Sequence, residues 1–64
     1  MRLYLSPDRY YAVMTQRDLF GHDCLVLAFG GRWSRRGRVL TIPYSDEALN
    51  EIDKRRLAHG YVLS

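Results

Sequence analysis

The apolar positions in the first third of the chain gather in two short stretches separated by polar turn residues, a pattern that predicts β-strands. Residues 2–5 and 9–16 are rich in leucine, tyrosine and β-branched side chains, and the Ser-Pro-Asp sequence at 6–8 is a turn between them. Residues 18–23 place Gly21 among polar side chains. This segment therefore predicts a hairpin connection to the next strand.

Two further strands are predicted in the middle of the chain. Residues 24–30 form an apolar run of seven, a length that favours a buried strand over a helix. Residues 37–44 form another strand, which ends near Pro43 because proline cannot donate to a sheet ladder.

The period changes after residue 44, and residues 46–59 predict a helix. Ser45 is a suitable N-cap, and acidic residues follow it in the first turn, where the helix dipole favours them. His59 suits the C-terminal cap and Gly60 the left-handed position after it. The apolar stripe comprises Ala48, Leu49 and Ile52, with Leu57 at its margin.

The order of elements predicts an α+β fold, a small antiparallel sheet with one C-terminal helix packed on one face. Residues 61–64 either return to the sheet or pack beneath the helix. Sixty-four residues are enough for one domain, 1–64, with a small core and marginal stability.

Several functional classes are disfavoured by the composition. Cys24 lies in an apolar run and is expected to be a buried structural thiol, and the two histidines are isolated from other potential metal ligands. The glycines match neither a dinucleotide-binding motif nor a P-loop. No enzyme, metal or cofactor is therefore expected. The apolar runs are too short to cross a membrane, and no secretory signal is seen, so a cytoplasmic location is expected.

The net charge of +3 is unevenly distributed. No acid occurs from Cys24 to Ser45, whereas residues 29–39, FGGRWSRRGRV, hold four arginines and the only tryptophan. Arginine binds phosphate through a planar fork, and an aromatic ring can stack on a base or sugar. Nucleic-acid contact is favoured over a solvated loop or a protein partner, and the candidate residues are Arg32, Trp33, Arg35, Arg36 and Arg38.

Three stretches in order carry a family resemblance: YYAV with RDLFGHDCLVLAFG, then GGRWSRRGRV, then PYSDEALNEIDKRRLAHGYV. With them, residues 9–62 resemble the WGR domain of DNA-break-sensing poly(ADP-ribose) polymerases and of short bacterial proteins. The resemblance implies a sheet with one helix against it and contact with DNA. It implies no catalysis.

The tryptophan departs from the family motif. When Gly31 and Arg32 are aligned with the family's Gly-Arg, the tryptophan position holds Gly30, and only Arg32 carries over directly. On a regular strand, Trp33 lies on the opposite face from Gly30 and Arg32 and can point into the core, an orientation that the pattern slightly favours. A bulge at the two glycines can instead turn the ring outward.

The expected function is thus a small DNA-binding module that contacts the phosphate backbone with weak sequence preference. Its location is then cytoplasmic and nucleoid-associated. The alternative is a protein-interaction module, either a homodimer or a complex with an acidic partner, since an exposed sheet edge can pair with another chain.

Overall fold

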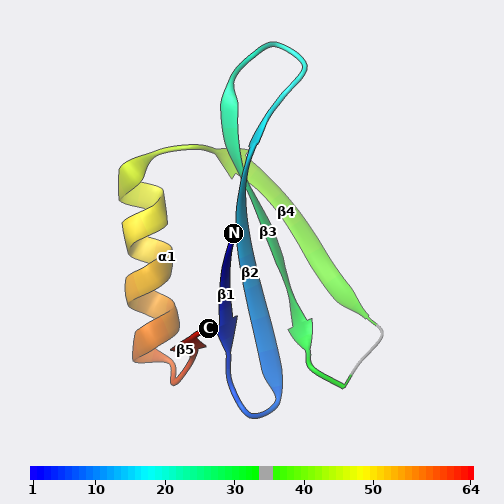
Figure 1. The fold of residues 1–64 in the computed structure, drawn as a ribbon, viewed down its shortest axis with the longest axis vertical. Coiled ribbons are helices and arrows are strands. Elements are labelled where there is room, and N and C mark those ends of the chain that lie inside the picture. Colours follow the sequence, from blue (N-terminus) through cyan, green and yellow to red (C-terminus); the bar gives the residue numbers. More distant parts are fainter. Residues whose placement is uncertain (34–35) are drawn as a thin grey trace.

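The computed structural model describes residues 1–33 and 36–64. Five strands form one antiparallel sheet in the order β4-β3-β2-β1-β5, and one helix lies against it (Figure 1). This confirms the predicted α+β fold. The elements are β1 (Arg2–Leu5), β2 (Arg9–Arg17), β3 (Asp23–Gly31), β4 (Gly37–Pro43), α1 (Asp46–Ala58) and β5 (Val62–Leu63).

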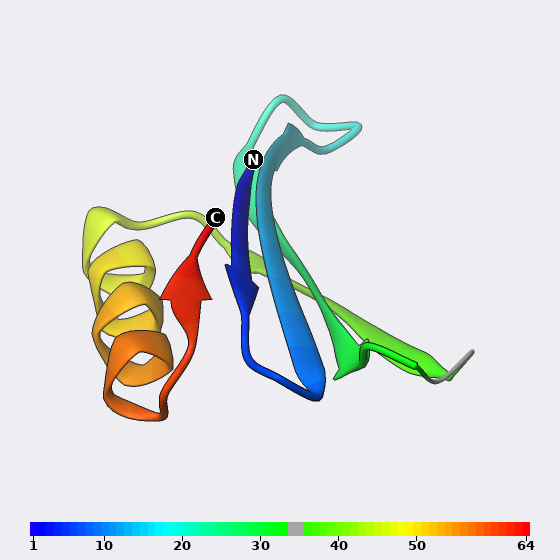
Figure 2. The same ribbon diagram turned by 60° about the horizontal axis from the view of Figure 1, so that its bottom comes forward.

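The C-terminal residues return to the sheet. Val62 and Leu63 pair with Leu5 and Tyr4, so β5 becomes the edge strand beside β1 (Figure 2). Of the two possibilities left open for residues 61–64, the first is therefore correct.

The core lies between the sheet and the helix. Tyr4 and Leu25 are fully buried, and Val13 and Leu27 are nearly so. The predicted apolar stripe of α1 packs on them through Ala48, Leu49 and Ile52, whereas Leu57 stays half exposed. Tyr4 also links the two layers, because its hydroxyl donates to Asp53 Oδ1 of the helix at 2.8 Å.

The helix begins and ends as its sequence predicts. Ser45 Oγ accepts a hydrogen bond from the Ala48 backbone N–H at 3.0 Å, which caps the N-terminus. At the other end His59 is the C-cap, and its N–H donates to the Arg55 carbonyl at 3.0 Å. Gly60 follows with a φ of 86°, a conformation that glycine adopts without strain.

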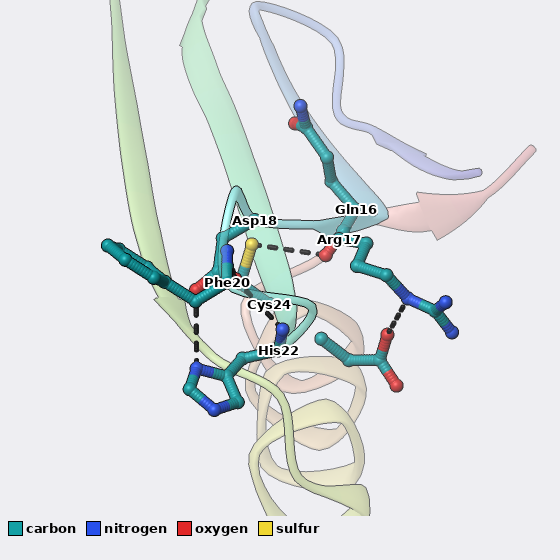
Figure 3. Close-up of polar contacts among 7 residues, drawn as sticks. Gln16, Arg17, Asp18, Phe20, His22 and Cys24 are labelled. Atoms are coloured by element: carbon teal, nitrogen blue, oxygen red, sulfur yellow. Dashed lines mark hydrogen bonds and ion pairs between the residues drawn. The ribbon is translucent and has the colours of Figure 1, made fainter.

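The connection between β2 and β3 is held by Asp18 (Figure 3). One of its carboxylate oxygens accepts from the backbone N–H groups of Phe20 and His22 at 2.9 and 2.8 Å, and Gly21 has a φ of 79°. Below the turn, Cys24 is buried as predicted, and its Sγ contacts the Gln16 carbonyl at 3.1 Å (Figure 3).

Strand pairing assigns the side chains to two faces, because residues opposite each other in a sheet share a face. One face carries the core and α1. The other is called the open face, since no described helix or strand covers it. Its residues are Leu3 and Leu5 of β1; Tyr10, Ala12, Met14 and Gln16 of β2; Cys24, Val26, Ala28 and Gly30 of β3; Gly37, Val39, Thr41 and Pro43 of β4; and Val62 of β5.

Candidate nucleic-acid interface

Three segments lie toward the same end of the molecule: residues 6–8, the end of β3, and residues 59–61 after α1 (Figure 1). Arg32 joins the first two. Its backbone N–H donates to the Asp8 carbonyl at 2.9 Å, and its Nη1 donates to the Ser6 carbonyl at 3.2 Å. Arg32 therefore fixes the chain that leaves β3 against the turn at residues 6–8.

Trp33 lies in the turn after β3 and is 84 % exposed. The core orientation that the sequence slightly favoured is wrong. The reason is not a bulge, since β3 pairs regularly with β2 through Gly31 opposite Arg9. The strand instead ends at Gly31, so the alternation of faces no longer applies at residue 33. The Arg32 guanidinium lies 5.6 Å from the centre of the indole ring.

Gly30 has little room for a side chain. Tyr10 lies opposite Gly30 across the sheet, and a Cβ on Gly30 would lie 3.4 Å from Cε1 of its ring. The same Cβ would lie 2.9 Å from the Arg36 carbonyl oxygen. A Cβ on Gly37 would lie 2.6 Å from the Tyr10 hydroxyl. The two glycines thus make room for the Tyr10 side chain on the open face.

We expect Gly30→Ala to destabilise the fold by about 1 to 3 kcal/mol, because its Cβ meets a backbone carbonyl that moves only with β4. Gly37→Ala should cost less, since its shortest contact is the mobile end of Tyr10. Urea unfolding of both variants measures the difference. Equal midpoints for Gly30→Ala and the wild type would show that the β3–β4 pair relaxes freely.

A groove of about 680 Å³ opens beside this end, on the helix-bearing face. Aromatic rings form much of its wall. The Tyr11 and Phe29 rings are stacked with centroids 5.3 Å apart, and the Arg56 guanidinium lies 4.6 Å from the Tyr11 ring centre and 5.3 Å from that of Tyr61. Arg9 and Asp8 line the rim.

A second, shallower hollow of about 590 Å³ shares Phe29 and Gly30 with this groove. Arg36 and Arg38 line it, and Arg38 lies opposite Phe29 in the β3–β4 register. The two hollows share the wall at Phe29 and Gly30 and are together called the basic groove, whose lining residues include Arg56 of α1 and Arg36 just before β4.

Electrostatics in the basic groove favour an anionic ligand. Arg9, Arg38 and Arg56 come from three separate elements, and Asp8 is the acid among the lining residues. Burial raises the pKa of the Tyr11 hydroxyl above its ordinary value of 10, and the nearby Arg56 opposes this shift. Tyr11 is therefore neutral near pH 7 and adds no negative charge.

Four of the five sequence-predicted residues lie in the described part of the chain, and Arg35, with Ser34, lies outside it. Arg36 and Arg38 line the groove, while Arg32 and Trp33 are in the adjoining turn. Sequence reasoning missed Arg9, Arg56 and the three rings Tyr11, Phe29 and Tyr61. A signal existed for one pair, because Arg9 and Tyr11 alternate onto one face of the second strand.

Among residues 1–33 and 36–64, no three or more His, Cys, Asp or Glu side chains are grouped to hold a metal ion. In the same part of the chain, α1 is too short and too polar to cross a membrane. Comparison of the chain with known protein families, with curated proteins and with solved structures finds no match.

Proposed function

We propose that this protein is a non-enzymatic module that binds nucleic acid, in the first place duplex DNA, through its phosphate backbone. One observation carries the proposal. Arginines from β2, β4 and α1 line the basic groove together with Arg36, and the wall of the groove contains stacked aromatic rings. The order of sequence motifs that resembles the WGR domain supports the same function.

Each part of the groove has a role in this mode of binding. Arg9, Arg36 and Arg38 line the basic groove, and guanidinium groups bind phosphate oxygens in bidentate fashion. Arg56 lies over tyrosine rings, which orient its charge toward the groove. Such contacts position a protein on DNA without reading base sequence, so we propose weak sequence preference.

Trp33 extends the surface at one end. Its exposed ring is held beside Arg32, whose backbone is anchored to Asp8, so the indole is available to stack on a sugar or an end base pair. A cytoplasmic, nucleoid-associated location follows from this proposal.

The test is a titration of the protein with a short blunt-ended duplex, followed by Trp33 fluorescence and by the anisotropy of labelled DNA. With two to four phosphates neutralised, log K should fall with log salt at a slope of about −2 to −3 between about 50 and 200 mM. Trp33 emission should change at low salt and recover at high salt. Competition with single-stranded DNA and with RNA then identifies the preferred form.

Flat anisotropy at low salt for all three nucleic acids would contradict nucleic-acid binding. Binding that is unchanged by salt would contradict the phosphate mechanism. A change in anisotropy without a change in Trp33 emission would keep the groove as the site but remove the indole from it.

A further inference from the structure

The open face carries no charge. Every charged residue of the described strands lies on the helix-bearing face by its register, including Arg9 and Arg38 of the basic groove. In an antiparallel sheet with one helical layer, the face away from the helix is normally the polar one. The helix-bearing face holds the apolar core as expected, but the open face departs from the expectation because its register holds no Asp, Glu, Lys or Arg. The lack of charge indicates that the open face is suited to contact with a partner.

Most side chains of the open face are apolar or small, and Tyr10, Gln16 and Thr41 are its polar members. Its central row runs Leu3, Ala12, Ala28, Val39 from one strand to the next. The two alanines make a low centre, and Tyr10 and Met14 stand beside it on β2. Val39 is 67 % exposed and Val62 68 % exposed, so apolar side chains reach both edges of the face.

The chain as a single copy exposes more surface than its size predicts. Size scaling gives a compact 7.5 kDa monomer about 4,200 Å² of accessible surface. This chain exposes 5117 Å². Its Cα atoms span 37 × 25 × 14 Å, so it is a thin slab. A second layer against the open face would remove much of this excess.

We propose that the open face is the interface of a homodimer, in which two copies pack sheet against sheet around a two-fold axis. The dimensions favour a sheet as the occupant. Four strands spaced by about 4.8 Å, over about six residues of about 3.3 Å, make a face roughly 20 Å wide and 20 Å long. A partner helix, about 10 Å in diameter, covers only half of that width.

A second copy meets the remaining requirements. An uncharged face needs an uncharged sheet of matching twist opposite it, and the chain itself supplies one, since two identical twisted sheets pack about 30° apart. Burying about 400 Å² of flat footprint on each copy, plus the relief of the side chains, approaches the lower limit of about 1,200 Å² for stable interfaces. The dimer has the helices on its two outer sides, and Arg9, Arg38 and Arg56 of each basic groove lie on the faces turned away from the interface.

The experiment is sedimentation velocity from low to high micromolar protein, with a matched pair of variants on one strand. Val39 and Leu40 are neighbours on β4, 67 % and 52 % exposed, and they lie on opposite faces. We expect the wild type to form a dimer with a dissociation constant on the order of micromolar. Val39→Lys should be monomeric throughout that range, and Leu40→Lys should dimerise like the wild type.

Thr41→Glu provides a second variant on the open face, at a position that is already polar and exposed, so the fold should tolerate it. It should also be monomeric. Circular dichroism confirms that each variant is folded. A wild type that stays monomeric at every concentration overturns the proposal, as does a Val39→Lys or Thr41→Glu chain that dimerises normally. Loss of dimerisation in Leu40→Lys alone overturns it as well, and assigns the interface to the other face of β4.

This inference does not rest on the proposed nucleic-acid binding. The dimer should persist as salt rises, because apolar burial is not screened, whereas phosphate contacts weaken. Sedimentation is measured without nucleic acid, so either conclusion can fail while the other stands.

Discussion

Replacing Arg9, Arg38 and Arg56 together with glutamine is expected to weaken duplex DNA binding on the order of a thousandfold at low salt. The three guanidinium groups come from β2, β4 and α1 and line the basic groove. Each charge-assisted contact contributes about 1.5 kcal/mol or more, and every 1.4 kcal/mol is a factor of ten. The salt slope of about −2 to −3 should lose most of its steepness, because fewer counterions are released.

The matched control removes the same charge elsewhere. Arg17, Lys54 and Arg55 lie outside the hollows, and two of them pair with acids: Arg17 with Asp23 at 3.5 Å and Arg55 with Glu51 at 3.1 Å. Their glutamine triple variant has the same net charge as the groove variant. Anisotropy titrations should show a much smaller loss of affinity for the control. Equal losses in both would mean that binding follows net charge and that the groove is not the site.

Most of the fold could be predicted from the sequence because its signals are local. Ser45 and Gly60 mark the helix ends through their own side-chain and backbone chemistry, and Gly21 marks a turn for the same reason. The pairing of Val62 and Leu63 with β1 was left open, since a two-residue strand has no period and is held only by its neighbour.

The site was only partly predictable, because it depends on residues distant in sequence. The arginines of 32–38 stand out as a cluster, whereas Arg56 appears in the sequence as an ordinary helix C-terminal cation. Only the packing of α1 on the sheet places Arg56 over Tyr11. Trp33 was assigned by continuing the alternation of a strand, and the assignment failed because β3 ends two residues earlier.

The two proposals concern opposite faces of the sheet: nucleic-acid binding the helix-bearing face, and dimerisation the open face. Charges gathered on the helix-bearing face supply the groove, and their absence from the other face allows two copies to associate. A dimer of this kind presents two grooves on opposite sides, so it can hold two duplexes at once. Bridging of DNA should then be lost in Val39→Lys, while the binding of a single duplex by each monomer is retained.

Tyr4→Ala is expected to destabilise the protein by about 3 to 5 kcal/mol, since it removes a large side chain that is fully buried. The total stability of a 64-residue domain is about 3 to 10 kcal/mol, so much of this variant should be unfolded at 25 °C. The hydroxyl's bond to Asp53 is lost as well, and the Arg2 guanidinium, 3.8 Å from that carboxylate, remains its partner. Urea unfolding followed by circular dichroism measures the loss, and an unchanged midpoint would contradict the central place of Tyr4 in the core.

Tyr4→Phe removes the hydroxyl and keeps the buried ring, so it measures the contribution of the hydroxyl alone, and this contribution should depend on pH. At neutral pH it should cost about 1.5 to 3 kcal/mol, for one hydrogen bond to a charged group. Burial first, and the bond to Asp53 second, raise the pKa of Tyr4 above its ordinary value of 10. The unfolded chain therefore loses this proton at a lower pH than the folded chain does. The contribution of the Tyr4 hydroxyl to the free energy of unfolding is fully present below pH 10. It falls as pH rises through the folded pKa, by at most about 1.4 kcal/mol per pH unit for one group.

Tyr4→Phe should reduce the decline in stability at high pH, and Tyr11, whose pKa burial also raises, should account for the decline that remains. Urea midpoints measured from pH 8 to pH 11 would contradict this if the two chains declined in parallel, because the Tyr4 proton would then bind equally well in both states.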